Sequence, residues 1–314
     1  MAMGGSTGRS ALIIGGSGFL GGAITRQLLE DGWETDVLSR GNKPTIPGSQ
    51  VIQADRTIQE EWKAAMEGRT YDLVVDCAGY KAADIESAIP VLKGKCAHYV
   101  FISTDYVYAS SNQTTYPIRE SAATHRDTPY AEGKLDCEAL LLAAWNEDSF
   151  PVTILRPPHI MGAGKELGCD QVLGRTPDLL SRIRRGGQEL QLLNDGQLLI
   201  QPVWSREIAL CISHLAGMER SWGHIFTFVG PEAVTARRYY EIIAEKLGVE
   251  LTFESLSIEQ HLQSKPGDRH YVRHRIYDTS HLTQVTGYQP HLKLEAAIQE
   301  TLDWMLAREA KHRS

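Results

Sequence analysis

Short apolar runs of strand length recur through the first half of the chain, and longer stretches with helical periodicity separate them. The predicted strands lie at residues 11–14, 35–39, 51–54, 72–77, 98–103 and 152–156. Helical patterns stand out at residues 19–32, 83–94 and 129–145. Because the strands are nearly continuous in apolar residues, helices should cover both faces of the sheet. The alternation therefore predicts an α/β fold with a doubly wound parallel sheet.

The pattern becomes more irregular after about residue 157. Helices are predicted at residues 177–185, 235–248 and 293–310, with strand-like runs at 197–204 and 224–230. This mixture predicts a smaller, mostly helical C-terminal lobe. We expect a disordered tail over residues 1–10 and a Rossmann-type sheet domain over 11–165. Strands near 197–204 and 224–230 should return to this domain. The remaining residues, 166–196 and 231–314, should form a substrate-binding lobe. Such a lobe would close the carboxyl-terminal edge of the sheet, where open α/β folds bind ligands.

Composition narrows the classes of protein. The 314 residues are 42% hydrophobic and 23% charged, as in ordinary soluble globular proteins. A formal net charge of −7 predicts no general attraction for nucleic acid or an anionic membrane. The five cysteines include no C-x-x-C pair, which argues against a disulfide framework or zinc site and favours a reducing compartment. Since we find no signal peptide, and no apolar run near the roughly 18 residues of a membrane span, we expect a cytoplasmic protein.

No metal site is expected from the sequence. His270 and His274 are four residues apart, which would place them on one face if that segment were helical. The surrounding sequence is loop-like and offers no obvious carboxylate partner, so solvated or phosphate-facing histidines are the preferred interpretation.

The stretch "ALIIGGSGFLGG" (11–22) joins the first predicted strand to the first helix. Its glycines follow the spacing G-x-x-G-x-x-G, and the missing side chains let a phosphate approach main-chain N–H groups at a helix N-terminus. The alternative is a tight turn that binds nothing. Phe19 and Leu20 would also pack the helix against the sheet. The candidate cofactor-binding residues in this stretch are Gly15, Ser17, Gly18, Phe19, Leu20 and Gly21.

The ends of the next strands carry further cofactor candidates. Ser39, Arg40 and Lys43 follow the second strand, where sites for NAD usually place Asp or Glu. A guanidinium suits a 2′-phosphate, so NADP is favoured over NAD, although Arg40 could also be an ordinary surface arginine. Asp55 after the third strand could bond an adenine amino group. The remaining candidates at these strand ends are Arg56, Ala78 and Gly79.

Tyr130 and Lys134 are the candidate catalytic pair. Residues four apart lie on the same face of a helix. The Lys134 ammonium can hold a cofactor ribose and lower the pKa of the Tyr130 phenol, which can then exchange a proton with a substrate hydroxyl as hydride moves. Ser103 and Thr104 end the preceding strand, and a hydroxyl there could hold the same substrate oxygen.

Three further stretches complete a family resemblance: "FISTDYVY" (101–108), "YAEGK" (130–134) and "LRPPHIMGAG" (155–164). With the glycine motif they resemble the extended short-chain dehydrogenase/reductase family, and within it the NAD-dependent epimerase/dehydratase group that acts on nucleotide sugars. The resemblance runs from about residue 11 to 305. It implies that Thr104, Tyr130 and Lys134 form the catalytic trio.

The same resemblance implies the neighbours of the reacting groups. Pro157 and His159 would lie beside the nicotinamide and the substrate, and Arg269 would bind phosphates of a sugar nucleotide. His159 stands where many members carry Asn. Two helices, 83–94 and 129–145, are where such enzymes usually form homodimers. The substrate-binding candidates are Thr104, Asp105, Tyr106, His159, Trp204 and Arg269.

Three functions remain open from the sequence. The leading hypothesis is an epimerase that oxidises a hydroxyl of a sugar nucleotide or nucleoside and reduces the keto intermediate on its other face. The second is an NADPH-dependent keto-sugar reductase, because "STDYV" (103–107) lacks the Glu of the sugar-nucleotide dehydratases and is similar to dehydrorhamnose-type reductases. The third is RNA binding, because "LSRGNK" and "VVDCAGY" are similar to chloroplast stem-loop RNA-binding proteins. The complete catalytic trio and the acidic net charge favour the two enzymes.

Overall fold

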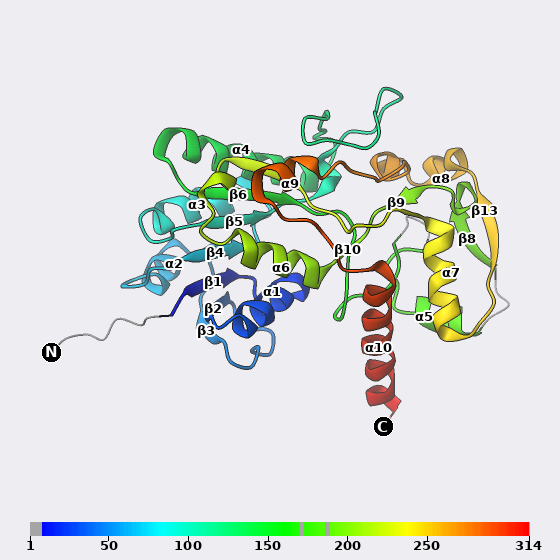
Figure 1. The fold of residues 1–314 in the computed structure, drawn as a ribbon, viewed down its shortest axis with the longest axis horizontal. Helices are drawn as coiled ribbons and strands as arrows, with labels where there is room; N and C mark the ends of the chain where they lie inside the picture. Colours follow the sequence, from blue (N-terminus) through cyan, green and yellow to red (C-terminus); the bar gives the residue numbers. More distant parts are fainter. Residues whose placement is uncertain (1–7, 170–172, 186–188, 314) are drawn as a thin grey trace.

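A computed structural model describes residues 8–169, 173–185 and 189–313 (Figure 1). Of the expected tail, residues 1–7 lie outside the described residues, while Ser10 already belongs to the first strand. All seven strands of the central sheet are parallel and follow the order β11-β6-β5-β4-β1-β2-β3. The strands are β1 (Ser10–Ile14), β2 (Glu34–Ser39), β3 (Gln50–Gln53), β4 (Leu73–Asp76), β5 (Tyr99–Ile102), β6 (Val152–Arg156) and β11 (His224–Thr227).

Helices cover both faces of this sheet, as the apolar strands predict. Because side chains alternate across a strand, Leu12 and Ile14 of β1 pack into one core and Ala11 and Ile13 into another. The first core is closed by α2 (Gln59–Ala65), α3 (Ala82–Leu92) and α4 (Pro129–Asp148), and the second by α1 (Phe19–Glu30), α6 (Ser205–Leu215) and α9 (Ser280–Thr286). The doubly wound, Rossmann-type α/β fold is therefore confirmed.

The rest of the chain forms a separate lobe with its own core, in which Tyr239 and Tyr240 are fully buried. Its helices are α5 (Leu179–Arg185), α7 (Ala236–Leu247), α8 (Ile258–Ser264) and α10 (Leu294–Arg313), and strands β8 (Glu189–Leu193) and β13 (Thr252–Leu256) pair with each other. In Figure 1 this lobe lies beside the sheet, and α10, which ends at the C-terminus, lies on the side of the lobe towards the sheet. No helix among the described residues is long and apolar enough to cross a bilayer.

The run at residues 197–204 does not add a strand to the central sheet. It splits into β9 (Leu199–Ile200), which pairs with β12 (Val234–Thr235), and β10 (Val203–Trp204), which pairs with β7 (Ile160–Met161). Pro202 separates them and supplies no backbone N–H for a continuous ladder. The run at 224–230, by contrast, provides the edge strand β11, parallel to β6.

The strand order reverses between β1 and β4, because β2 and β3 extend the sheet on one side and β5, β6 and β11 on the other. Ligands of open α/β folds bind at the carboxyl ends of strands at such a switch point. The glycine stretch follows β1 at this position.

Candidate active site

The glycine stretch forms a tight turn between β1 and α1. Gly15 has φ +81°, which favours glycine, and its N–H bonds the Leu38 carbonyl at 3.1 Å. A Cβ on Gly21 would overlap the Gly15 carbonyl oxygen, so this helix can start against the loop only with glycine there. Gly18 precedes α1 without a side-chain cap, which leaves N–H groups at the helix start free for a ligand. The turn therefore has the close approach and the donors that a dinucleotide pyrophosphate needs.

The neighbouring strand ends carry Arg40, Asp55, Ala78 and Gly79. Among the described residues, Arg40 is exposed and has no carboxylate within ion-pair distance. Asp55 accepts hydrogen bonds from Thr57, which lower the pKa of its carboxyl, and the Arg40 charge acts in the same direction. Ala78 would lie 3.1 Å from a Cβ on Gly15. Of these four residues, Ala78 lies directly against the glycine turn, and the cofactor roles of all four stay predictions.

Arg56 differs from the expectation. Its guanidinium is buried, with Nη1 2.7 Å from the Asp76 carboxylate and Nη2 2.5 Å from the Asp84 carbonyl oxygen. Asp76 is buried, and an arginine beneath the sheet edge neutralises it. The side chain of Arg56 therefore supports the strand ends and does not face a cofactor.

Lys134 reaches the strand ends from α4. Its Nζ donates to the carbonyl oxygens of Gly79 and Ile102, each at 2.7 Å. The helix comes this close because residue 133 is glycine: a Cβ there would overlap the Tyr80 carbonyl oxygen. Burial lowers the pKa of the Lys134 ammonium, and the Asp76 carboxylate acts in the opposite direction.

Tyr130 lies one turn earlier on α4, close to Thr104. Although 41% of Tyr130 is exposed, the loss of water around its phenol raises its pKa to about 12, while hydrogen bonding with Thr104 acts in the opposite direction. The Thr104 oxygen accepts from the Tyr106 N–H at 3.2 Å, so the hydroxyl hydrogen can be donated to a ligand. Ser103 is different, because its hydroxyl donates to the buried Glu138 carboxylate at 2.5 Å. Of the two hydroxyls that the sequence offered, only that of Thr104 faces Tyr130.

Aromatic rings form a stack beside this pair. Tyr106 lies 5.9 Å from the Tyr130 ring and 4.3 Å from the Tyr271 ring, nearly parallel to both. Tyr271 comes from the C-terminal lobe, and the Arg275 guanidinium lies 5.0 Å from its ring centre. Sequence reasoning missed Tyr271 and Arg275, although the alternation of basic and aromatic residues in "HYVRHRIY" (270–277) could have indicated them.

Asp105 also differs from the expectation of substrate binding. It is 2% exposed, and its Oδ2 accepts from Arg275 Nη2 at 2.8 Å and from the Tyr277 hydroxyl. Both partners belong to the segment that returns from the lobe. The carboxylate therefore ties the lobe to the end of β5 instead of facing a substrate.

His159 follows β6, beside Pro157. Its Nδ1 lies 3.3 Å from Arg175 Nη2, while its Nε2 is buried without a hydrogen-bond partner. Burial lowers the pKa of His159, and the Arg175 and Arg275 charges add to this effect, so the imidazole is neutral. A buried N–H without a protein partner is rare, and this one is a donor that a ligand could use. Arg175 was also missed from sequence.

Trp204 and Arg269 both have protein partners. The Trp204 indole donates to the Glu300 carboxylate at 3.0 Å, and its ring packs against the core of the lobe. Arg269 is exposed and pairs with Asp127. Neither contact brings these side chains to Tyr130, so their substrate roles stay predictions.

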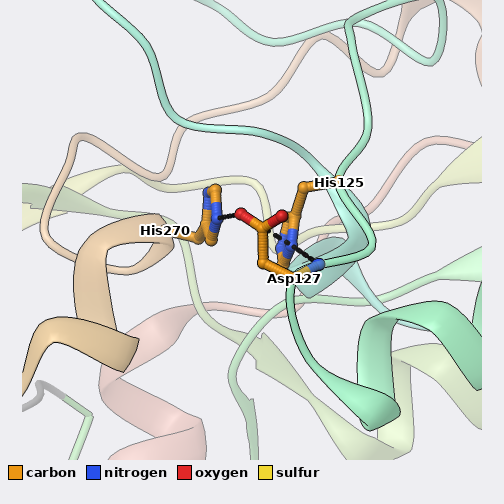
Figure 2. Close-up of side chains that lie close together, drawn as sticks. All are labelled: His125, Asp127 and His270. Carbon is orange, nitrogen blue, oxygen red and sulfur yellow. Dashed lines mark hydrogen bonds and ion pairs between the residues drawn. The ribbon is translucent and has the colours of Figure 1, made fainter.

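Figure 2 shows His125 and Asp127, just before α4, together with His270 from the lobe. Each imidazole Nδ1 accepts a backbone N–H, from Asp127 at 3.3 Å and from Ser110 at 3.1 Å. His125 Nε2 therefore carries hydrogen and donates it to the Tyr106 carbonyl oxygen at 2.7 Å. His270 Nε2 lies 2.7 Å from the Asp127 carboxylate and 3.0 Å from the Arg269 Nε that donates to it. Arg269 contacts the same carboxylate, where a cation would bind. The three side chains are close enough together to bind a metal ion. Their hydrogen bonds instead connect the C-terminal lobe to the segment before the catalytic helix.

Comparison with known proteins finds relatives of this chain. Over 245 residues the chain is 24% identical to the chloroplast stem-loop binding protein of 41 kDa b of Arabidopsis thaliana, a match that covers 73% of this chain and 61% of that protein. It is also 24% identical over 239 residues to the 2'-dehydrokanamycin reductase of Streptomyces kanamyceticus, covering 76% of this chain and 66% of that enzyme. The chain thus spans less than two thirds of the length of both relatives.

The solved structure of epimerase Mth375 from Methanothermobacter thermautotrophicus has the same fold. Its TM-score is 0.80 at 16% identity, over 98% of this chain and 94% of that one. A family model described as the NAD dependent epimerase/dehydratase family matches residues 11–93 and 91–226, more than half of the chain. Because this match extends over more than half of the sequence, the protein belongs to the NAD-dependent epimerase/dehydratase family.

Proposed function

We propose that the protein is an NADP-dependent reductase that reduces a keto group of a sugar or sugar nucleotide to a hydroxyl. The observation that carries this proposal is the arrangement of Thr104, Tyr130 and Lys134 at the carboxyl edge of the sheet, next to the glycine turn. A nicotinamide cofactor supplies the hydride in such a reaction. The family description supports a nicotinamide dinucleotide as the cofactor.

NADP is proposed over NAD because of the end of β2. Arg40 is exposed there without an acidic partner among the described residues. It stands at the position where a site for NAD usually has an Asp or Glu that binds a ribose hydroxyl. The glycine turn and the start of α1 would hold the pyrophosphate. Ala78 and Gly79 would leave room for the dinucleotide beside β4.

Tyr130 supplies the proton. A pKa of about 12 keeps the phenol protonated at neutral pH, which is the form that reduction of a carbonyl requires. Thr104 can donate its hydroxyl hydrogen to the same substrate oxygen, because its oxygen already accepts the Tyr106 N–H. The Lys134 ammonium stabilises negative charge that develops on the phenol oxygen. His159 offers an unpartnered N–H to a ligand acceptor.

Epimerisation is the second candidate, supported by the family description. The same three side chains can remove a proton as a hydroxyl is oxidised and return it after the keto sugar has turned over. The two reactions differ in cofactor handling, because an epimerase recovers its cofactor within each turnover whereas a reductase must release it.

The deciding experiment is to denature the purified protein, identify any released dinucleotide, and follow NADPH consumption with a panel of keto sugars. We expect little retained cofactor and NADPH consumption that Tyr130→Phe reduces by about 10²-fold or more. The exposed Tyr116 provides the matched control, since Tyr116→Phe should leave the rate unchanged. Stoichiometric bound NAD, released only on denaturation, would favour the epimerase. Failure to bind either dinucleotide, with salt-sensitive RNA binding instead, would contradict both enzymes.

A further inference from the structure

A cavity of about 600 Å³ lies beside the glycine turn, on the side of α1 that faces α6 and α10. Ser17, Gly18 and Phe19 form one wall, and Trp304 of α10 forms part of another. Neither the catalytic trio nor Arg40 or Asp55 is among the described residues that line it. The cavity therefore shares the glycine turn with the expected cofactor site but extends away from the site of hydride transfer.

Cations outnumber anions in this cavity. Arg26, Lys43 and Arg206 line it, and none of them has a carboxylate within 4.0 Å among the residues that the structure describes. Of the two carboxylates in the lining, Glu300 is already engaged, since it accepts from the Ala163 N–H at 3.2 Å and from an indole N–H at 3.0 Å. Glu30 is the other. The cavity thus presents unpaired positive charge.

Two helices begin at this cavity. Gly18 precedes α1 and Trp204 precedes α6, and neither residue caps its helix with a side chain. The first N–H groups of both helices are therefore free to bind an anion.

Ser205 gives an independent indication of a ligand. The residue is 3% exposed and lines the cavity, and its hydroxyl has no hydrogen-bond partner among the described residues. A Cβ on residue 162 would lie only 2.5 Å from this oxygen, so the position of the hydroxyl requires a glycine at residue 162. The side chain is held in place by its burial, and its hydroxyl is left available to a ligand in the cavity.

We propose that this cavity binds a phosphate group, held by the Ser205 hydroxyl, the first N–H groups of α6 and the Arg206 guanidinium, with Arg26 and Lys43 completing the charge. The phosphate has two sources. One is the 2′-phosphate of NADP(H), which rests on the proposed function and would be bound by Lys43, in the loop after β2, together with Arg40, which lies outside the cavity lining; the other is a separate small phosphorylated molecule. The chemistry of recognition is the same for both.

The test measures binding by titration calorimetry on the full chain, without substrate. NADPH, NADH and inorganic phosphate are titrated into the wild type, Arg206→Ala and Ser205→Ala. Arg206 is exposed, so its variant keeps the fold, and Lys246→Ala on the distant α7 controls for loss of one positive charge. Loss of a charged hydrogen bond should weaken phosphate binding by about tenfold or more.

The result assigns the source. If the phosphate is that of NADP(H), both variants weaken NADPH about tenfold and leave NADH unchanged. If it belongs to a separate ligand, inorganic phosphate binds the wild type and not the variants, while both dinucleotides are unaffected. Equal weakening of NADPH and NADH would overturn the proposal, because the residues would then serve the pyrophosphate common to both. Unchanged binding of all three probes would also overturn it. A wild type that binds phosphate but neither dinucleotide would contradict the proposed function and leave the cavity assignment standing.

Discussion

The buried ion pair between Glu138 and Arg156 should be the most sensitive polar contact near the catalytic helix. It joins α4, which carries Tyr130 and Lys134, to the end of β6. Both side chains are almost completely buried, at 4% and 5% exposure. We therefore consider Glu138→Gln, which keeps the size of the side chain and removes only its charge.

The expected loss follows from the contacts. Glu138 accepts from Arg156 Nε at 2.9 Å and Nη2 at 2.5 Å, and from the Ser103 hydroxyl at 2.5 Å. The Arg156 Nη1 already lacks a partner, so no second acceptor stands ready. Removing one partner of a buried pair leaves an uncompensated charge, which costs about 3–5 kcal/mol. Since glutamine still accepts one hydrogen bond, we expect the free energy of unfolding to fall by about 3 kcal/mol.

The assay is urea unfolding of the wild type and variant, followed by tryptophan fluorescence and circular dichroism. Asp148→Asn is the matched control, because Asp148 lies on the same helix as Glu138 and the substitution also replaces a carboxylate by an amide. Its ion pair, with Lys93 at 2.8 Å, is exposed. Exposed pairs contribute only about 0–1 kcal/mol, so this variant should unfold like the wild type. A Glu138→Gln variant no less stable than Asp148→Asn would refute the account.

Three further predictions concern the site and the core. Thr104→Ala should lower kcat/KM for keto-sugar reduction by about 10²-fold, whereas Ser103→Ala should leave it unchanged, and equal losses would contradict the assignment of the hydroxyls. Tyr271→Ala removes a stacking partner at the lobe side of the site and should raise KM about fivefold with kcat unchanged in steady-state kinetics; a loss confined to kcat would argue against a binding role. Burial lowers the pKa of His98 from 6.5 to about 4, so between these two pH values the unfolded chain binds a proton that the folded chain does not. The contribution of His98 to the free energy of unfolding is therefore fully present above pH 6.5. It should fall by about 1.4 kcal/mol per pH unit as the pH drops towards 4. Thermal melts across this range test the last prediction, and His98→Asn should show a weaker dependence.

The parts of the site that sequence reasoning identified are those governed by local geometry. The spacing of Gly15, Gly18 and Gly21 states which residues must lack a side chain at a strand–helix turn, and the structure shows the contacts that require this. Tyr130 and Lys134 lie on one helix, so their separation of four residues already places them on a common face.

Misplaced residues were those whose partners lie elsewhere in the chain. Arg56 is held by Asp76, 20 residues away, and Asp105 by Arg275, 170 residues away. A strand-end position makes both look accessible, but burial of a charge requires an opposite charge, and only the packed molecule shows that each has one.

By itself, the sequence determined the parallel sheet, the glycine turn and the catalytic helix, because apolar periodicity and backbone sterics act over a few residues. Tertiary structure decided which hydroxyl faces Tyr130, which arginines are neutralised, and how Tyr271 of the lobe comes to stack beside the catalytic pair. The phosphate cavity belongs to this second class, since Ser205, Arg26 and Trp304 meet only when α1, α6 and α10 pack together. The physical reason is that the free energy of a polar group depends on what surrounds it after folding, and distant segments supply those surroundings.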